Sequence, residues 1–234
     1  MLAYGALLLS LSVFITAPAN SAARDAEIIR GFNLTVFGAE YAPFGVQSRY
    51  IRKYQRPVRF YIHNLSRVNR TGAARRFIQS LNRSIKGLKT QIVSSPSSAN
   101  FNVYIVDRKD YVKTVRNKIY RRKNASAPGK CLVRSVFSRR GIIRSDAAIV
   151  SDGGEALFRR CLIEEILQGL GPLNEHRSLT RSVFNDSSKQ TSFTRFDRLI
   201  LNMLYDPRIK NGASLEKVQK ILPAVLRTAK KRVR

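Results

Sequence analysis

The stretch "CLIEEILQGLGPLNEH", residues 161–176, carries the strongest structural signal in this sequence. Its apolar residues recur at helical spacing up to a glycine, which predicts an amphipathic helix that ends near Gly171. Its polar positions follow the zinc-protease helix, in which histidines at i and i+4 bind the metal and the intervening glutamate activates water. Two interpretations stay open: a metal site whose ligands have been replaced, and an ordinary core helix.

Aligned with that zinc-protease pattern, each position of the motif falls on a defined residue. The first ligand position is Glu164, the catalytic glutamate position is Glu165, and the second ligand position is Gln168. The turn glycine is Gly171, and the third ligand position is Asn174. Every spacing is kept and every histidine is replaced. The remaining carboxylate and amide oxygens would make a hard, weak site, better suited to Ca²⁺ than to zinc.

The histidine count limits the metal chemistry further. The whole chain holds two histidines, His63 and His176, so one chain cannot supply three imidazoles to a metal. A weaker zinc site with Glu164 and His176 stays open, although His176 lies two residues beyond the expected position. Glu164 and Glu165 are also not expected to act as a facing glycosidase pair, because neighbours on a helix diverge by about 100°.

The first 23 residues have the pattern of a secretory signal peptide. They contain no charged side chain, and an apolar run from Ala6 to Ile15 is followed by small residues at 17–23. We therefore expect an exported protein, periplasmic or secreted, with one domain over residues 24–234 and no further membrane-spanning segment. The alternative is an uncleaved N-terminal anchor, for which the run is short.

The exported part holds two cysteines, Cys131 and Cys161. In an oxidising compartment such a pair predicts one disulfide, which would stabilise the fold by about 3–4 kcal/mol. Two buried free thiols are the alternative.

The order of the predicted elements indicates one α+β domain. Strands are expected over 56–65, 90–94 and 101–106, and a hairpin over 131–150. Helices are expected over 71–89, 108–124, 161–170, 192–205 and 215–234. Ser214 is placed to cap the last helix, and Pro223 should kink or break it.

The charge is strongly and unevenly positive. The chain has 43 basic and 15 acidic residues, a net charge of +28. Residues 107–144 hold 13 basic and 2 acidic residues, whereas residues 146–206 hold 7 basic and 9 acidic ones. Such a surface attracts anions, which makes anionic envelope polymers or lipids possible partners of 107–144 and of the tail "RTAKKRVR". Nucleic acid is attracted too, but an exported protein seldom meets it.

Several motifs in register resemble a known family. They are "FNLTVFGAEY", "RRCLIEEILQGLG" with "LNE", "SVFND" and "FDRLILNMLYDPRIKNG". Over about residues 32–215 the chain resembles the bacterial domain-of-unknown-function family 2927, which is grouped with zincin-like metallopeptidases. That family's helix also has Glu-Glu and Gln in place of the histidines, and Glu175 stands here where Asp is usual.

The resemblance implies a zincin-like fold: a mixed sheet with a preceding helix, a degenerate active-site helix and a C-terminal helical part. It implies that Glu164, Glu165 and Gln168 face the old cleft. The residues that it places in the loop nearby are Ser182, Asn185 and Asp186. It implies no activity.

Three functions stay open at this point. The first is non-catalytic binding or scaffolding in the cell envelope by a cleft without zinc. The second is a hydrolase with a non-standard site, in which Glu165 would be the general base. The third is a cationic binder of anionic envelope polymers or lipids.

Overall fold

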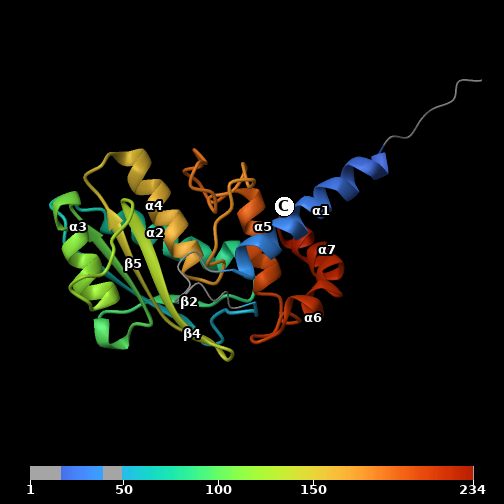
Figure 1. The fold of residues 1–234 in the computed structure, drawn as a ribbon, viewed down its shortest axis with the longest axis horizontal. Helices are drawn as coiled ribbons and strands as arrows, with labels where there is room; N and C mark the ends of the chain where they lie inside the picture. Colours follow the sequence, from blue (N-terminus) through green and yellow to red (C-terminus); the bar gives the residue numbers. More distant parts are fainter. Residues whose placement is uncertain (1–16, 39–48, 234) are drawn as a thin grey trace, which may run out of the picture.

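The computed structural model describes residues 17–38 and 49–233, which form a mixed five-stranded sheet flanked by helices (Figure 1). The strand order is β2-β1-β3-β5-β4; β4 runs antiparallel to β5, and all other neighbours are parallel. The strands are β1 (Val58–Asn64), β2 (Thr90–Ile92), β3 (Phe101–Val106), β4 (Cys131–Ser138) and β5 (Gly141–Val150). The predicted α+β class is therefore confirmed.

Helices cover both faces of this sheet. They are α2 (Thr71–Ser84) and α4 (Glu155–Gln168) on one face, and α3 (Arg108–Thr114) with the π-helical turn η3 (Val115–Tyr120) on the other. Alternate residues of β3 divide between the two faces: Phe101 and Val103 pack on the α4 side, Tyr104 and Val106 on the α3 side. Every residue of β3 is buried, as expected for a central strand in a parallel sheet.

The remaining helices form a separate layer beside the sheet (Figure 1). They are α1 (Ala17–Val36), α5 (Arg195–Leu204), α6 (Leu215–Gln219) and α7 (Leu222–Arg232). Helices α1, α5 and α7 pack against one another. The Ser214 side chain accepts a hydrogen bond from the Lys217 amide, and Pro223 lies in the first turn of α7, so the predicted cap and break are both confirmed.

The largest differences from the predicted elements are in three helices. Helix α4, which contains the beginning of the stretch 161–176, begins at Glu155, six residues before that stretch. Helix α2 ends at Ser84, where the prediction extended to 89. Helix α1 was not predicted at all. The predicted signal segment, residues 1–23, lies largely outside the described residues, and its last seven residues form the start of α1.

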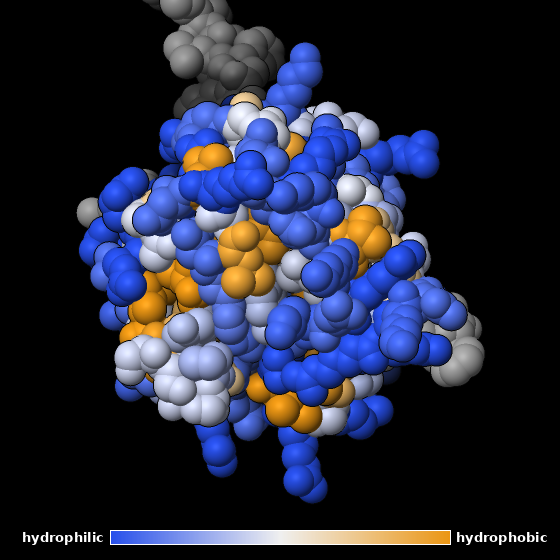
Figure 2. Space-filling model, turned by 90° about the vertical axis from the view of Figure 1, so that its left-hand side faces the viewer, coloured by the Kyte–Doolittle hydropathy of each residue, from blue (hydrophilic) through white to orange (hydrophobic). Residues whose placement is uncertain are grey.

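No helix within the described ranges is long and apolar enough to cross a membrane. Figure 2 shows the side of the molecule that carries α3, and hydrophilic side chains cover most of it, with apolar side chains in separate patches. Helix α3 and the turn η3 belong to the basic segment 107–144.

Candidate functional site

Helix α4 is buried along its last eight residues, from Cys161 to Gln168. Its apolar residues pack against β4 and β5, so it is a core helix. Its polar residues are buried as well: Glu164 and Glu165 expose only 3% and 5% of their surface. Buried carboxylates cost free energy unless they are hydrogen-bonded or neutralised, so this arrangement is not that of a solvated helix face.

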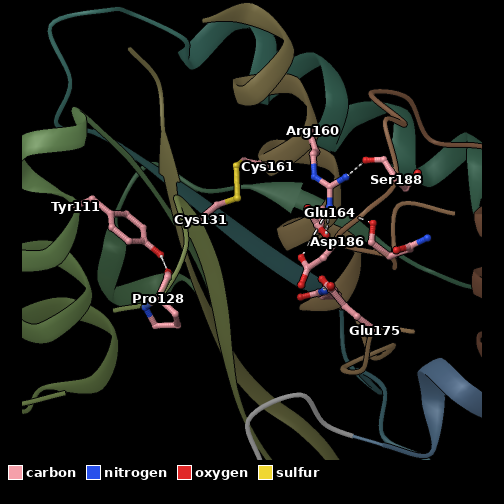
Figure 3. The surroundings of a disulfide bond; sticks show 11 residues. Tyr111, Pro128, Cys131, Arg160, Cys161, Glu164, Glu175, Asp186 and Ser188 are labelled. Carbon is pink, nitrogen blue, oxygen red and sulfur yellow. Dashed lines mark hydrogen bonds and ion pairs between the residues drawn. A yellow bond between two sulfur atoms is a disulfide. The ribbon is translucent and has the colours of Figure 1, made fainter. Parts of the chain in front are cut away.

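A disulfide links α4 to the edge of the sheet. Cys131, the first residue of β4, is bonded to Cys161, and the two Cα atoms are 5.7 Å apart. The predicted disulfide is therefore confirmed. Figure 3 shows that the bond bridges the strand and the helix directly beside Arg160 and Glu164.

A cleft of about 380 Å³ lies between the start of β4 and this part of α4. The lining residues come from three segments: Pro128 to Val133, one face of α4, and the loop after α4. The ionisable ones are Lys130, Arg160, Glu164, Glu165, Glu175 and Asp186. Carboxylates thus outnumber cations here, although the protein as a whole carries a charge of +28.

Glu164 lies at the centre of the carboxylates. One of its oxygens lies within 4.8 Å of a Glu165 oxygen and the Cys131 sulfur, and a second group of oxygens from Glu164, Glu175 and Asp186 is equally close. Glu164 and Glu165 were expected to point in different directions. Instead, the carboxylate groups at the ends of both side chains lie close together in one cleft. Both still extend from the same wall, so they do not flank a substrate from opposite sides.

Arg160, one helical turn before Glu164, was missed by the sequence analysis. Its guanidinium donates to Glu164 Oε1 at 3.1 Å and to the carbonyl oxygens of Asn185 (3.2 Å) and Ser188. It also lies 3.9 Å from Asp186 Oδ1. The i, i+4 spacing of Arg160 and Glu164 was a usable signal for this contact. Arg160 thus fixes the loop 185–188 over the acidic cleft (Figure 3).

The surroundings of Glu164 favour its neutral form. Burial is the main cause and the adjacent charge of Glu165 is the second, and together they raise the pKa of Glu164 to about 8. The hydrogen bond with Glu175 and the charge of Arg160 act in the opposite direction and are weaker. At neutral pH Glu164 therefore holds a proton, and it can donate a hydrogen bond within the cleft.

This raised pKa predicts a specific pH dependence of stability. Between about pH 4.5 and 8 the folded state keeps a proton that the unfolded state releases, so the free energy of unfolding falls as the pH rises. The variant Glu164→Gln lacks this titration. From pH 5 to pH 9 we expect it to gain roughly 2 kcal/mol relative to the wild type, about half of what the full shift would give, because solvent screens part of the interaction.

Urea denaturation of both proteins at the two pH values measures this change. The variant Glu216→Gln, at an exposed glutamate on α6, is the matched control and should follow the wild type at both pH values. A difference between Glu164→Gln and the wild type that does not change with pH would contradict the raised pKa.

Two other predicted positions have clear places. Gln168 is buried and its Nε2 donates to Glu175 Oε1, so its amide points toward the carboxylate cluster. Asn174 does not: its Nδ2 donates to the Leu34 carbonyl at 2.8 Å and holds the end of α1. The third ligand position of the motif has therefore become a structural contact.

The predicted loop residues divide in the same way. Asp186 lines the cleft. Ser182 is fully buried and donates to Asp197 Oδ1 at 2.6 Å, while Asp197 caps the start of α5. The Asn185 side chain donates to the Arg177 carbonyl at 3.1 Å. His176 Nδ1 lies 2.8 Å from the Ser178 hydroxyl on the exposed side of the loop.

These side chains do not fit a zinc ion. No imidazole lines the cleft, and the third ligand position is engaged elsewhere. The oxygens of Glu164, Glu175 and Asp186 are the donors that a hard cation such as Ca²⁺ prefers. Here, however, the guanidinium of Arg160 already lies between Glu164 and Asp186 and takes up part of that group.

Comparison with known proteins gives one match. The model of family DUF2927, described as a protein of unknown function, matches residues 25–224. No curated protein and no solved structure matches the chain significantly.

Proposed function

This chain belongs to family DUF2927, and from that starting point we propose that it is an exported, zincin-like protein that binds a basic side chain of an extended peptide without zinc. The binding site is the acidic cleft between β4 and α4. The observation that carries the proposal is the group of buried carboxylates next to an edge strand.

The edge strand supplies the backbone part of this binding. β4 is the last strand in the sheet order, and no described strand pairs with its outer side. Open strand edges are the usual place for an extended peptide to add as a further strand. Because β4 lines the cleft, a peptide lying along it would present a side chain to α4.

The carboxylates supply the selectivity. Four acidic side chains line the cleft against two basic ones, and Arg160 is already engaged by Glu164 and the loop 185–188. A Lys or Arg side chain would therefore donate a charge-assisted hydrogen bond to Glu165 or Glu175. A mixed sheet with an antiparallel edge strand beside the rewritten motif helix supports the zincin-like relationship.

Export is supported by two features. The N-terminal pattern is that of a signal peptide, and the Cys131–Cys161 disulfide is typical of an oxidising compartment.

A peptide-binding measurement tests this function. A fluorescent hexapeptide with one central Lys should bind the wild type at low salt, and the same peptide with Glu should bind at least about tenfold more weakly. Tighter binding of the Lys peptide than of the Glu peptide is informative, because the net charge of +28 alone would favour the Glu peptide. The variant Glu165→Gln/Glu175→Gln should lose the preference.

The matched control is again Glu216→Gln, which removes one exposed carboxylate and should leave peptide binding unchanged. Tighter binding of the Glu peptide would contradict the proposal. So would a full equivalent of zinc that remains bound after purification in zinc-containing buffer, because the proposed cleft holds no metal.

A second candidate function is hydrolysis with Glu165 as the general base. The converging oxygens of Glu164 and Glu165 and the raised pKa of Glu164 favour it, since such a pair offers one acid and one base. Cleavage of the Lys peptide that disappears in Glu165→Gln would support this function. Cleavage that persists in the variant would exclude Glu165 as the base.

A further inference from the structure

A polar row crosses the sheet on the face opposite α4. The strand register places Tyr61 of β1 beside Asn102 of β3, Asn102 beside Asp146 of β5, and Asp146 beside Arg134 of β4. Neighbouring strands lie about 4.8 Å apart, so the row extends over roughly 14 Å. α3 and η3 pack over the other end of this face, on the cluster that contains Tyr104 and Val106.

The two buried residues of this row, Asn102 and Asp146, form hydrogen bonds with two partly exposed residues beside it, His63 and Arg144. Asn102 and Asp146 each expose 4%, and Asn102 Nδ2 donates to Asp146 Oδ1 at 3.0 Å. Asn102 Oδ1 accepts from His63 Nε2 at 3.0 Å. Asp146 accepts from the guanidinium of Arg144 at 2.7 to 2.9 Å. The network is fully paired, and it orients an imidazole and a guanidinium at the open face.

Aromatic rings adjoin this network. The His63 ring stacks on Tyr104 with centroids 4.2 Å apart, and the Tyr61 ring lies edge-on at 4.6 Å. Tyr61 and His63 are half-buried, so both rings can contact a ligand from the solvent side. The Tyr61 and His63 rings stand at 70° to each other, so they form an angled surface. Aromatic rings beside cations are suited to a chain of rings that carry negative charge.

The cations around this surface have few acidic partners. Of the 13 basic residues in 107–144, Arg144 alone forms an ion pair with a carboxylate among the described residues. Lys118 and Arg121 lie close enough to act electrostatically on His63 and Tyr104 respectively. Their charge is therefore available to a bound anion.

The backbone at this point is unusual in two respects. η3 is a π-helical turn, a feature often found at functional sites. It ends at Arg121, which has φ 55° and is the one described residue other than glycine with a positive φ. Such a conformation costs free energy in a non-glycine residue, and the residue that adopts it here is a cation close enough to act on Tyr104.

We propose that this surface, formed by Tyr61, His63, Lys118, Arg121 and Arg144, binds a carboxylate-bearing polysaccharide. The carboxylates would pair with Lys118 and Arg121, and the sugar rings would lie against Tyr61 and His63. Charge complementarity carries this assignment, and the expected export of the protein favours a glycan over nucleic acid as the partner. The surface lies on the other side of the sheet from the peptide cleft, so the two sites can be tested independently.

The test uses an alginate hexamer, a polymer of uronic acids, as the probe at 150 mM salt. We expect Lys118→Gln/Arg121→Gln to weaken its binding about tenfold, and Tyr61→Leu to weaken it at least about threefold through the lost ring. The matched control is Arg75→Gln/Arg83→Gln, two exposed arginines on α2, which should change it less than about twofold. All three variants should keep the wild-type midpoint of urea denaturation, which shows that they are folded.

Three outcomes would overturn this inference. Equal losses in the site variant and the α2 control would show non-specific attraction to the net charge. A dT oligonucleotide of equal charge that binds more tightly than alginate, and through the same residues, would identify the surface as a nucleic-acid site. Anionic vesicles that bind more tightly than both would identify it as a membrane contact.

Discussion

Replacing both cysteines, in Cys131→Ser/Cys161→Ser, should lower the free energy of unfolding by about 3–4 kcal/mol. The bond closes a loop of 30 residues, and the loss of that restraint increases the entropy of the unfolded chain. The bond also joins the edge strand β4 covalently to helix α4, which carries Glu164 and Glu165, so its loss should loosen the contact between these two elements (Figure 3). Urea denaturation of the wild type and the variant measures the difference.

Wild-type protein treated with reducing agent is the control, since it should unfold at the same urea concentration as the double variant. The variant itself should not respond to reductant, because the chain has no other cysteine. A loss of less than about 1 kcal/mol would show that packing alone holds β4 against α4. In the folded variant, weaker binding of the Lys peptide would show that the link also shapes the cleft.

The sheet was largely predictable from the sequence because each strand has a distinct pattern. The continuous apolar run of β3 and the two runs of the β4–β5 hairpin stand between clear turn residues. Helix α1 was missed since its sequence, "APANSAARDAEIIRGFNLTV", combines small, charged and apolar residues without a clear period. Its buried face exists only because α5 and α7 pack against it, and no local pattern encodes that contact.

The candidate site was predictable only in part. The motif spacing identified Glu164, Glu165 and Gln168 because one helix fixes their relative positions. Asp186 was expected near the cleft only from the family resemblance, and Glu175 was not expected to line it. Both enter the cleft from a segment whose path depends on distant contacts, such as the hydrogen bond of Asn174 to the end of α1. The polar row of the opposite sheet face depends on strand register, which the sequence does not reveal.

Gly171 stands at the turn position of the zinc-protease pattern, and the structure gives a reason for a glycine there. Gly171 has φ +144°, where the chain turns away from the end of α4. The segment before it is held on both sides: the Gly169 carbonyl accepts from the Ser145 hydroxyl, and the Leu170 carbonyl accepts from the Tyr205 hydroxyl. The backbone there has no room to move, so the glycine is retained for the fold and not for a metal.

For this reason Gly171→Ala should destabilise the protein by about 3 kcal/mol or more. An added Cβ would lie 2.6 Å from the Arg52 carbonyl oxygen and 2.7 Å from a methyl group of Leu204. Neither neighbour can yield easily, because Arg52 is fully buried and Leu204 belongs to the core. The positive φ adds strain that any side chain would carry. Thermal and urea denaturation both measure the loss.

Gly72→Ala is the matched control, since Gly72 lies in the first turn of α2 and an added Cβ meets only a flexible arginine end at 3.4 Å. That substitution should leave stability unchanged or raise it by up to about 1 kcal/mol, because alanine favours the helix. If Gly171→Ala were as stable as Gly72→Ala, the turn after α4 would tolerate a side chain. The glycine of the motif would then need another explanation, such as the close approach of a ligand to the backbone at the end of the cleft helix.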